Sequence, residues 1–120
     1  MKQLEWMGSS YKDLLEIPSD VQSMMGYALY LAQVGEKHED AKPLKGFKGA
    51  GVLEIVDDFQ GDTYRAVYTV KLEFAVYVLH VFQKKSKSGI ATPKQVIDLI
   101  EKRLKLAEQY HQEQYADRQK

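Results

Sequence analysis

Three apolar segments separated only by short turns constrain this chain more than any other feature. Residues 52–56, 64–70 and 74–82 are rich in β-branched and aromatic residues, a composition that is typical of strands. The connections between them, residues 57–62 and 71–73, are too short to cross over to a parallel neighbour. These segments therefore predict a three-stranded antiparallel meander.

Helical periodicity flanks this meander on both sides. Apolar residues at three- and four-residue spacing predict a short helix ahead of Pro18, a longer helix over residues 19–34 and a C-terminal helix over residues 93–108. Gly35 follows the longer helix, where a left-handed residue commonly ends a helix. With a short N-terminal strand, LEWM, this order predicts an α+β fold: a twisted antiparallel β-sheet with an N-terminal helix hairpin on one face and a C-terminal helix.

The length of the chain, 120 residues and 13.8 kDa, fits one domain spanning residues 1–120. Residues 36–51 are polar and rich in glycine, which predicts a loop. Apolar residues become sparse after Glu108, so we expect residues 109–120 to form an exposed or frayed tail, with an idle His111.

Several classes of protein are disfavoured by composition. The chain has no cysteine and its three histidines are scattered, so we expect neither a metal nor another cofactor. No apolar run approaches the roughly 18 residues of a membrane span, and the N-terminus lacks the apolar segment of a secretory signal. The expectation is a soluble cytoplasmic protein without membrane contact.

Charge is balanced overall but unevenly distributed. Residues 1–40 hold three lysines and seven carboxylates, whereas residues 41–93 hold eight basic and five acidic residues. A basic middle beside an acidic first third predicts a polar molecule with one positive face, which suits an anionic partner.

Arg65 is a single arginine within an otherwise apolar strand. Alternation places its side chain on the same face as Val67 and Thr69. If the preceding turn leaves four residues unpaired, Glu54 lies directly opposite Arg65 and can form a cross-strand ion pair. Two interpretations follow: a structural clasp, or a guanidinium held ready for a phosphate, which its planar fork can bind bidentately.

The third strand ends in further candidate residues. Lys84, Lys85 and Lys87 lie within four residues, next to His80 and Phe82 at the end of the strand. Positive charges crowded together disfavour one another's protonation, which suits a group that transfers protons. The predicted loop before the meander adds Lys42, Lys45 and Lys48.

Several short stretches, in this order and spacing, resemble the RelE/HigB-like toxins of type II toxin–antitoxin systems, specifically the phage-related HigB-like subgroup of the RelE/ParE superfamily. The resemblance covers about residues 15–108. The matching stretches are Pro43-Leu44-Lys45-Gly46, Val52-Leu53-Glu54-Ile55, Tyr64-Arg65-Ala66-Val67-Tyr68, and Leu79 to Lys87 followed by Thr92-Pro93.

The resemblance implies a toxin that acts as a ribosome-associated mRNA endoribonuclease, inhibits translation and is silenced by a helix-turn-helix antitoxin in a hetero-oligomer. The chain is neutral, whereas such toxins are usually basic. Two alternatives remain open: a ParE-like toxin that inhibits gyrase, and a non-catalytic binding module of the same fold.

Metal-independent RNA cleavage requires the 2′-hydroxyl to attack the adjacent phosphate, with a base, an acid and cations to stabilise the developing charge. Arg65 is the expected phosphate clamp, supported by Glu54. The expected proton-transfer group is Lys84 or Lys85. His80 and Phe82 are supporting residues, and the expected RNA-binding residues are Lys42, Lys45, Lys48 and Lys87.

Overall fold

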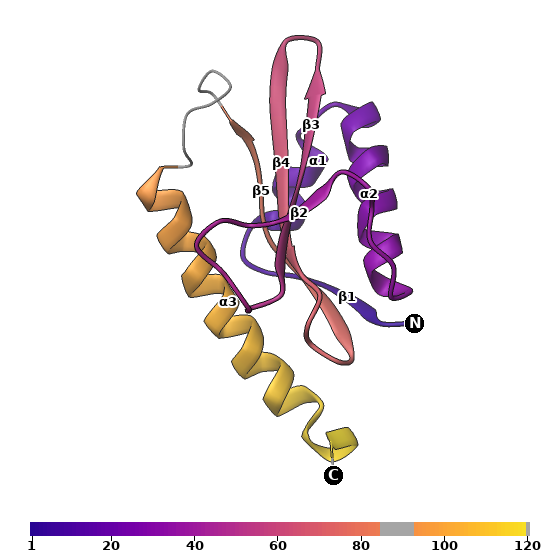
Figure 1. Cartoon of the computed structure of the whole chain (residues 1–120), viewed down its shortest axis with the longest axis vertical. Helices are drawn as coiled ribbons and strands as arrows, with labels where there is room; N and C mark the ends of the chain where they lie inside the picture. Colours follow the sequence, from indigo (N-terminus) through magenta and orange to yellow (C-terminus); the bar gives the residue numbers. More distant parts are fainter. Residues whose placement is uncertain (85–92, 120) are drawn as a thin grey trace.

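The computed structural model describes residues 1–84 and 93–119, with side chains given through Asp117. A five-stranded sheet lies between the two N-terminal helices on one face and the long C-terminal helix on the other (Figure 1). The α+β class and the placement of the helices are therefore as predicted. The elements are β1 (Gln3–Trp6), α1 (Ser10–Leu15), α2 (Ser19–Gln33), β2 (Ala41–Pro43), β3 (Val52–Phe59), β4 (Asp62–Thr69), β5 (Ala75–Lys84), α3 (Lys94–Gln114) and the 3-10 turn η1 (Ala116–Gln119).

The strand order is β1-β5-β4-β3-β2. The predicted meander, β3 to β5, is antiparallel and occupies the middle of the sheet. The sheet as a whole is mixed, because β1 runs parallel to β5 and pairs Gln3 with Ala75. A parallel partner is possible here because the long connection through α1, α2 and the meander separates the two strands.

The stretch predicted as a loop, residues 36–51, contains a further strand. β2 pairs antiparallel with β3 and sets Lys42 opposite Glu54. Leu44 and Phe47, which follow β2, are buried in the core beneath α3. Three residues are too few to produce a recognisable alternation, so sequence patterns could not reveal this edge strand.

The β3–β4 hairpin closes more tightly than expected. Phe59 pairs with Asp62, so only Gln60 and Gly61 form the turn. Both have positive φ, 50° and 86°, as a type I′ turn requires. The predicted connection over residues 57–62 is therefore too long, and the condition of four unpaired residues is not met, because Asp57, Asp58 and Asp62 are strand residues.

Two apolar clusters cover the two faces of the sheet. The first joins α1 and α2 to side chains such as Ile55 and Tyr68. The second joins α3 to side chains such as Val67, Tyr77 and Leu79. The alternation predicted for β4 is thereby confirmed, because Val67 faces α3 whereas Tyr68 faces α2.

The C-terminal segment is ordered by burial on one side. α3 continues to Gln114, and both His111 and Tyr115 are buried. The Nε2 atom of His111 accepts a hydrogen bond from the backbone N–H of Phe74 at 3.2 Å. The expectation of an idle His111 is therefore wrong, whereas residues 109, 110 and 112–114 are exposed, as the prediction of an exposed or frayed tail allowed, and they are helical. None of the helices in the described ranges is both long and apolar enough to cross a bilayer.

Candidate functional site

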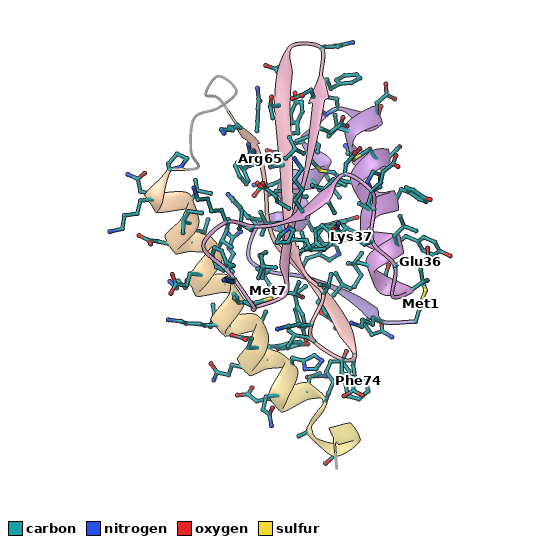
Figure 2. All side chains as sticks on the ribbon, viewed as in Figure 1. Met1, Met7, Glu36, Lys37, Arg65 and Phe74 are labelled. Carbon is teal, nitrogen blue, oxygen red and sulfur yellow. The ribbon has the colours of Figure 1, made fainter. Side chains whose placement is uncertain are left out.

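Arg65 and Glu54 form the ion pair predicted from the sequence. Nη1 of Arg65 lies 2.8 Å from Oε2 of Glu54, and the two side chains are only 16% and 17% exposed. Arg65 lies toward the end of the sheet at which α3 begins (Figure 2). The predicted alignment is wrong by two residues: Arg65 pairs across the strands with Val56, and Glu54 pairs with Val67. The contact is therefore diagonal, within reach of two long side chains on one face.

The strand register brings further candidates to the face that carries Arg65. Directly paired residues share a face, as do residues two apart along a strand. Phe82 pairs with Arg65, and Lys84 pairs with Thr63, two residues before Arg65. Lys42 pairs with Glu54 from the edge strand. Three cationic side chains thus share one face of the sheet around a single partly buried ion pair.

The guanidinium of Arg65 has hydrogen-bonding capacity beyond this ion pair. An arginine carries five N–H donors, and one bond joins Arg65 to Glu54. The Nε atom is buried and finds no hydrogen-bond acceptor within the described parts of the chain. A planar cation held at one corner by a carboxylate can still present donors to a second anion, and phosphate oxygens match that geometry.

His80 lies on the same face and is held by α3. Nη1 of Arg103 is 3.3 Å from Nδ1 of His80 and donates to the carbonyl of Leu79 at 2.9 Å. Burial lowers the pKa of His80 below its ordinary value, the positive charge of Arg103 lowers it further, and Asp13 opposes both. Because an arginine only donates hydrogen bonds, Nδ1 is the acceptor that faces Arg103.

Arg103 is the residue that sequence reasoning missed. Its position was informative, because it lies three residues after Ile100 and four before Ala107, both buried. A basic residue on the buried stripe of a helix must reach a polar partner. Arg103 finds such partners in the backbone of β5 and in Ser9, whose Oγ is 3.4 Å from Nη2.

The remaining lysines are not all brought together. Lys42 is exposed beside Glu54, whereas Lys48 lines a pocket of about 320 Å³ against α3, with Glu101 and Glu108 on its wall. Lys45 is exposed on the connection that follows β2. The candidates Lys85 and Lys87 lie outside the described residues.

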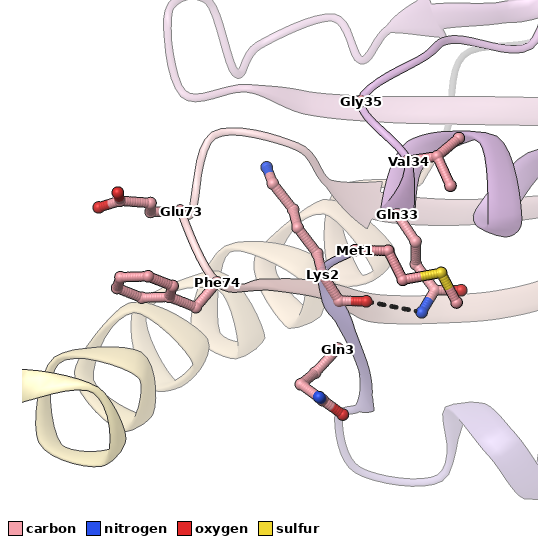
Figure 3. Close-up of a pocket in the computed structure, with 8 residues that line it drawn as sticks. All are labelled: Met1, Lys2, Gln3, Gln33, Val34, Gly35, Glu73 and Phe74. Atoms are coloured by element: carbon pink, nitrogen blue, oxygen red, sulfur yellow. Dashed lines mark hydrogen bonds between the residues drawn. The ribbon is translucent and has the colours of Figure 1, made fainter. Parts of the chain in front are cut away.

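A second pocket, of about 350 Å³, lies at the opposite end of β5 from Phe82. Figure 3 shows it between the N-terminal residues, the end of α2 and the connection from β4 to β5. Gln33 closes one wall by donating from Nε2 to the carbonyl of Lys2 at 2.8 Å. Its charged lining residues are Lys2 and Glu73, so it lacks the cluster of cations found around Arg65.

Metal-binding side chains do not converge in the described residues. No group of three histidine, aspartate or glutamate side chains there is placed to hold a metal ion. The face around Arg65 carries cations and one carboxylate partner.

Comparison with solved structures places the fold among known ones. The toxin RelE of E. coli, solved as a double arginine-to-alanine mutant in the free state, matches with a TM-score of 0.57 and 21% sequence identity. The match covers 85% of this chain and 96% of that chain. No curated protein sequence matches the chain.

A family model gives the relationship at the level of sequence. The model described as phage derived protein Gp49-like (DUF891) matches residues 12–105, which include both partners of the ion pair. This match and the RelE-like fold confirm the resemblance that the sequence motifs indicated. The chain belongs to the phage derived protein Gp49-like family, a family of the RelE/HigB toxin type.

Proposed function

We propose that the protein is the toxin of a type II toxin–antitoxin system and acts as a metal-independent endoribonuclease on mRNA at the translating ribosome. The observation that carries this proposal is the partly buried Arg65–Glu54 pair on a sheet face that also carries Lys42 and Lys84. Membership of the family and the RelE-like fold support the toxin class. The local cations support an anionic substrate although the whole chain is neutral.

In this proposal Arg65 binds the scissile phosphate and stabilises the charge that develops when the 2′-hydroxyl attacks it. Glu54 fixes the direction of the guanidinium, because it holds Nη1 at 2.8 Å. Lys84, two residues from Phe82 along β5, or Lys85, transfers the proton to or from the reacting oxygens. Lys42 and Lys45, with Lys48 and Lys87, bind neighbouring phosphates.

The test is induced expression of Arg65→Ala in bacterial cells. Removal of one positioned transition-state donor costs about 100- to 1,000-fold in rate, so we expect growth arrest to disappear. A matched control is Lys105→Ala, which removes an exposed cation from α3 and should leave toxicity intact. Circular dichroism and urea unfolding of both purified variants check that each folds. Arrest by Arg65→Ala equal to wild type would show that the site is assigned wrongly.

The target is tested separately from the site. Cleavage of mRNA by purified protein in a translation reaction, in the presence of EDTA at a level the ribosomes tolerate, is the expected result. Inhibited gyrase and DNA breaks without cleaved transcripts would replace the nuclease with a ParE-like activity. Unaffected growth and intact transcripts would leave a binding module in which Arg65 and Glu54 are a clasp.

The proposed partner is a helix-turn-helix antitoxin. We expect its gene directly beside the gene for this chain, and co-expression of the two should restore growth. Size-exclusion chromatography with light scattering of the co-expressed proteins should show a stable hetero-oligomer.

A further inference from the structure

An aromatic pair lies beside Arg65 on the same face of the sheet. The rings of Phe82 and His80 are stacked, with centroids 4.7 Å apart and planes inclined by 18°. Phe82 is the direct cross-strand neighbour of Arg65 on β5. A nearly parallel stack of two flat side chains therefore lies one strand away from the guanidinium.

A β-bulge in β5 lies next to this aromatic pair. Val67 pairs with His80, and Tyr68 pairs with Val78, so Leu79 is an extra residue between them. Such a bulge redirects the neighbouring side chains and is common next to functional sites. The carbonyl of Leu79 accepts from Arg103, which also contacts Nδ1 of His80. The bulge and the arginine together fix the ring that backs Phe82.

Arg103 is itself fixed by the first helix. Its Nη2 contacts Oγ of Ser9, and that hydroxyl donates to Oδ2 of Asp13 at 2.7 Å. Gly8 lies so close that a Cβ atom there would be 2.6 Å from Nη2 of Arg103. Contacts from α1 and α3 thus meet at the back of the aromatic pair, which limits the movement of His80.

We propose that Phe82, backed by His80 and positioned by Arg103, stacks against one nucleobase of a single-stranded RNA whose phosphate binds at Arg65. A base is flat and polarisable, and successive bases of single strands stack on aromatic side chains in many RNA-binding proteins. The inference rests on the proposed function, since it needs RNA at Arg65. The part of His80 in this proposal is the shape and stiffness of the stack, since its ring lies parallel to Phe82 and is held by Arg103.

The stacking surface formed by Phe82 and His80, here called the shelf, is tested with short single-stranded RNAs that carry one 2-aminopurine at successive positions. We expect one position to show quenched fluorescence on binding to wild type. Phe82→Leu keeps an apolar side chain against the α3 core but removes the aromatic face, and should weaken binding about 5- to 150-fold and abolish the quenching. Phe82→Trp keeps an aromatic face and should retain both the wild-type affinity and the quenching. The salt dependence of binding should be unchanged, because no cation is removed.

A second probe separates stacking from a folding defect. An RNA with an abasic residue at the quenched position should bind wild type and Phe82→Leu equally well. Arg103→Gln should reduce quenching while the salt dependence remains, and urea unfolding reports the stability of each variant. Equal affinity of Phe82→Leu and wild type for the intact RNA would overturn the shelf.

The outcomes also separate the shelf from the proposed function. RNA binding that depends on Phe82 without cleavage on ribosomes would support the shelf and overturn the nuclease. Cleavage that is indifferent to Phe82→Leu would overturn the shelf and leave the nuclease standing. A wild-type protein that binds none of these RNAs would overturn both.

Discussion

Glu54 lies two residues away from the position directly opposite Arg65, yet the two side chains meet at 2.8 Å across β3 and β4. The guanidinium must lean along the sheet toward Val67, the true cross-strand neighbour of Glu54. The carboxylate therefore fixes the direction of the arginine as well as balancing its charge. An ion pair of this kind can serve as a clasp and as a means of orienting a donor.

The strength of the pair is measured by a double-mutant cycle with Glu54→Gln and Arg65→Met. We expect a favourable coupling of about 1 kcal/mol, because both side chains are largely shielded from water. The exposed pair Glu101 and Lys105 is the matched control, and should give less than about 0.5 kcal/mol. Urea unfolding of the four proteins in each cycle gives both values. Equal coupling in the two cycles would show that burial does not strengthen the Arg65 pair.

The β3–β4 turn can be improved without touching the site. Gln60 has a φ of 50°, a left-handed conformation that asparagine adopts more easily. We expect Gln60→Asn to raise the free energy of unfolding by about 0.5–1 kcal/mol, and Gly61→Ala, at a φ of 86°, to lower it by about 1 kcal/mol. Thermal and urea unfolding check both. RNA cleavage by Gln60→Asn should match wild type.

Alanine substitutions at Gly8 and Gly35 distinguish the cost of backbone strain from the cost of a steric clash with Arg103. Both have positive φ, 54° and 84°, but only a Cβ at Gly8 would meet Arg103. We expect Gly35→Ala to cost about 1 kcal/mol and Gly8→Ala to cost more, with weaker RNA binding in Gly8→Ala alone. Urea unfolding and fluorescence titration with the 2-aminopurine RNA measure the two effects. Identical behaviour of the two variants would show that Arg103 adjusts freely.

Stability should depend on pH through His111. Burial lowers the pKa of His111, Lys2 lowers it further and Glu73 opposes them, so the folded pKa lies below the ordinary value of 6.5. The unfolded chain therefore binds the proton first, and stability that is present above pH 6.5 is lost as the pH falls through the folded pKa. His111→Gln keeps an acceptor for the N–H of Phe74 but cannot titrate.

We expect urea unfolding of wild type to show this loss between about pH 7 and pH 5, and His111→Gln to show less of it. His80 has a pKa lowered by burial and by Arg103, so it adds in the same direction. Urea unfolding of His80→Gln measures the contribution of His80 to this pH dependence. An unchanged pH slope in the double variant would assign the dependence to other groups.

The lysines of the second strand and its following loop should differ in their effect on RNA binding. Lys42 lies next to the Arg65–Glu54 pair, whereas Lys48 lines a pocket that Glu101 and Glu108 also line. For a single strand, each lost phosphate contact reduces the slope of log K against log salt by about 0.7. We expect the full reduction in Lys42→Gln and a smaller one in Lys48→Gln, because the nearby carboxylates weaken the attraction of Lys48 for a phosphate. Fluorescence titration at several salt concentrations measures both slopes, and equal slopes would show that these carboxylates have no effect.

Much of the fold could be predicted because strong local periodicity coincided with short connections. The meander, the faces of β4 and the end of α2 at Gly35 all follow from such patterns. Arg65 and Glu54 were also identifiable, since charged residues in apolar strands need partners. Their exact alignment was not, because it depends on the left-handed conformation of Gln60, a residue with no strong preference for it.

Other features depend on contacts between residues far apart in the chain. β2 exists only because β3 offers an edge, and the bulge at Leu79 leaves no trace in local alternation. His111 appeared to lie in a polar tail, but Phe74 and Tyr115 surround it. Burial of that kind is decided by tertiary packing, which a single sequence does not display.

The pairing of β1 with β5 has a consequence for the newborn chain. Gln3 cannot pair until Ala75 has been synthesised, and β5 ends nine residues after Ala75, at Lys84. At about 5–20 residues per second, the first strand spends several seconds without its neighbour while the rest is synthesised. Contacts of such large sequence separation form late in folding. The sheet that carries Arg65 can therefore be completed only after residue 84 has been synthesised, long after the first strand.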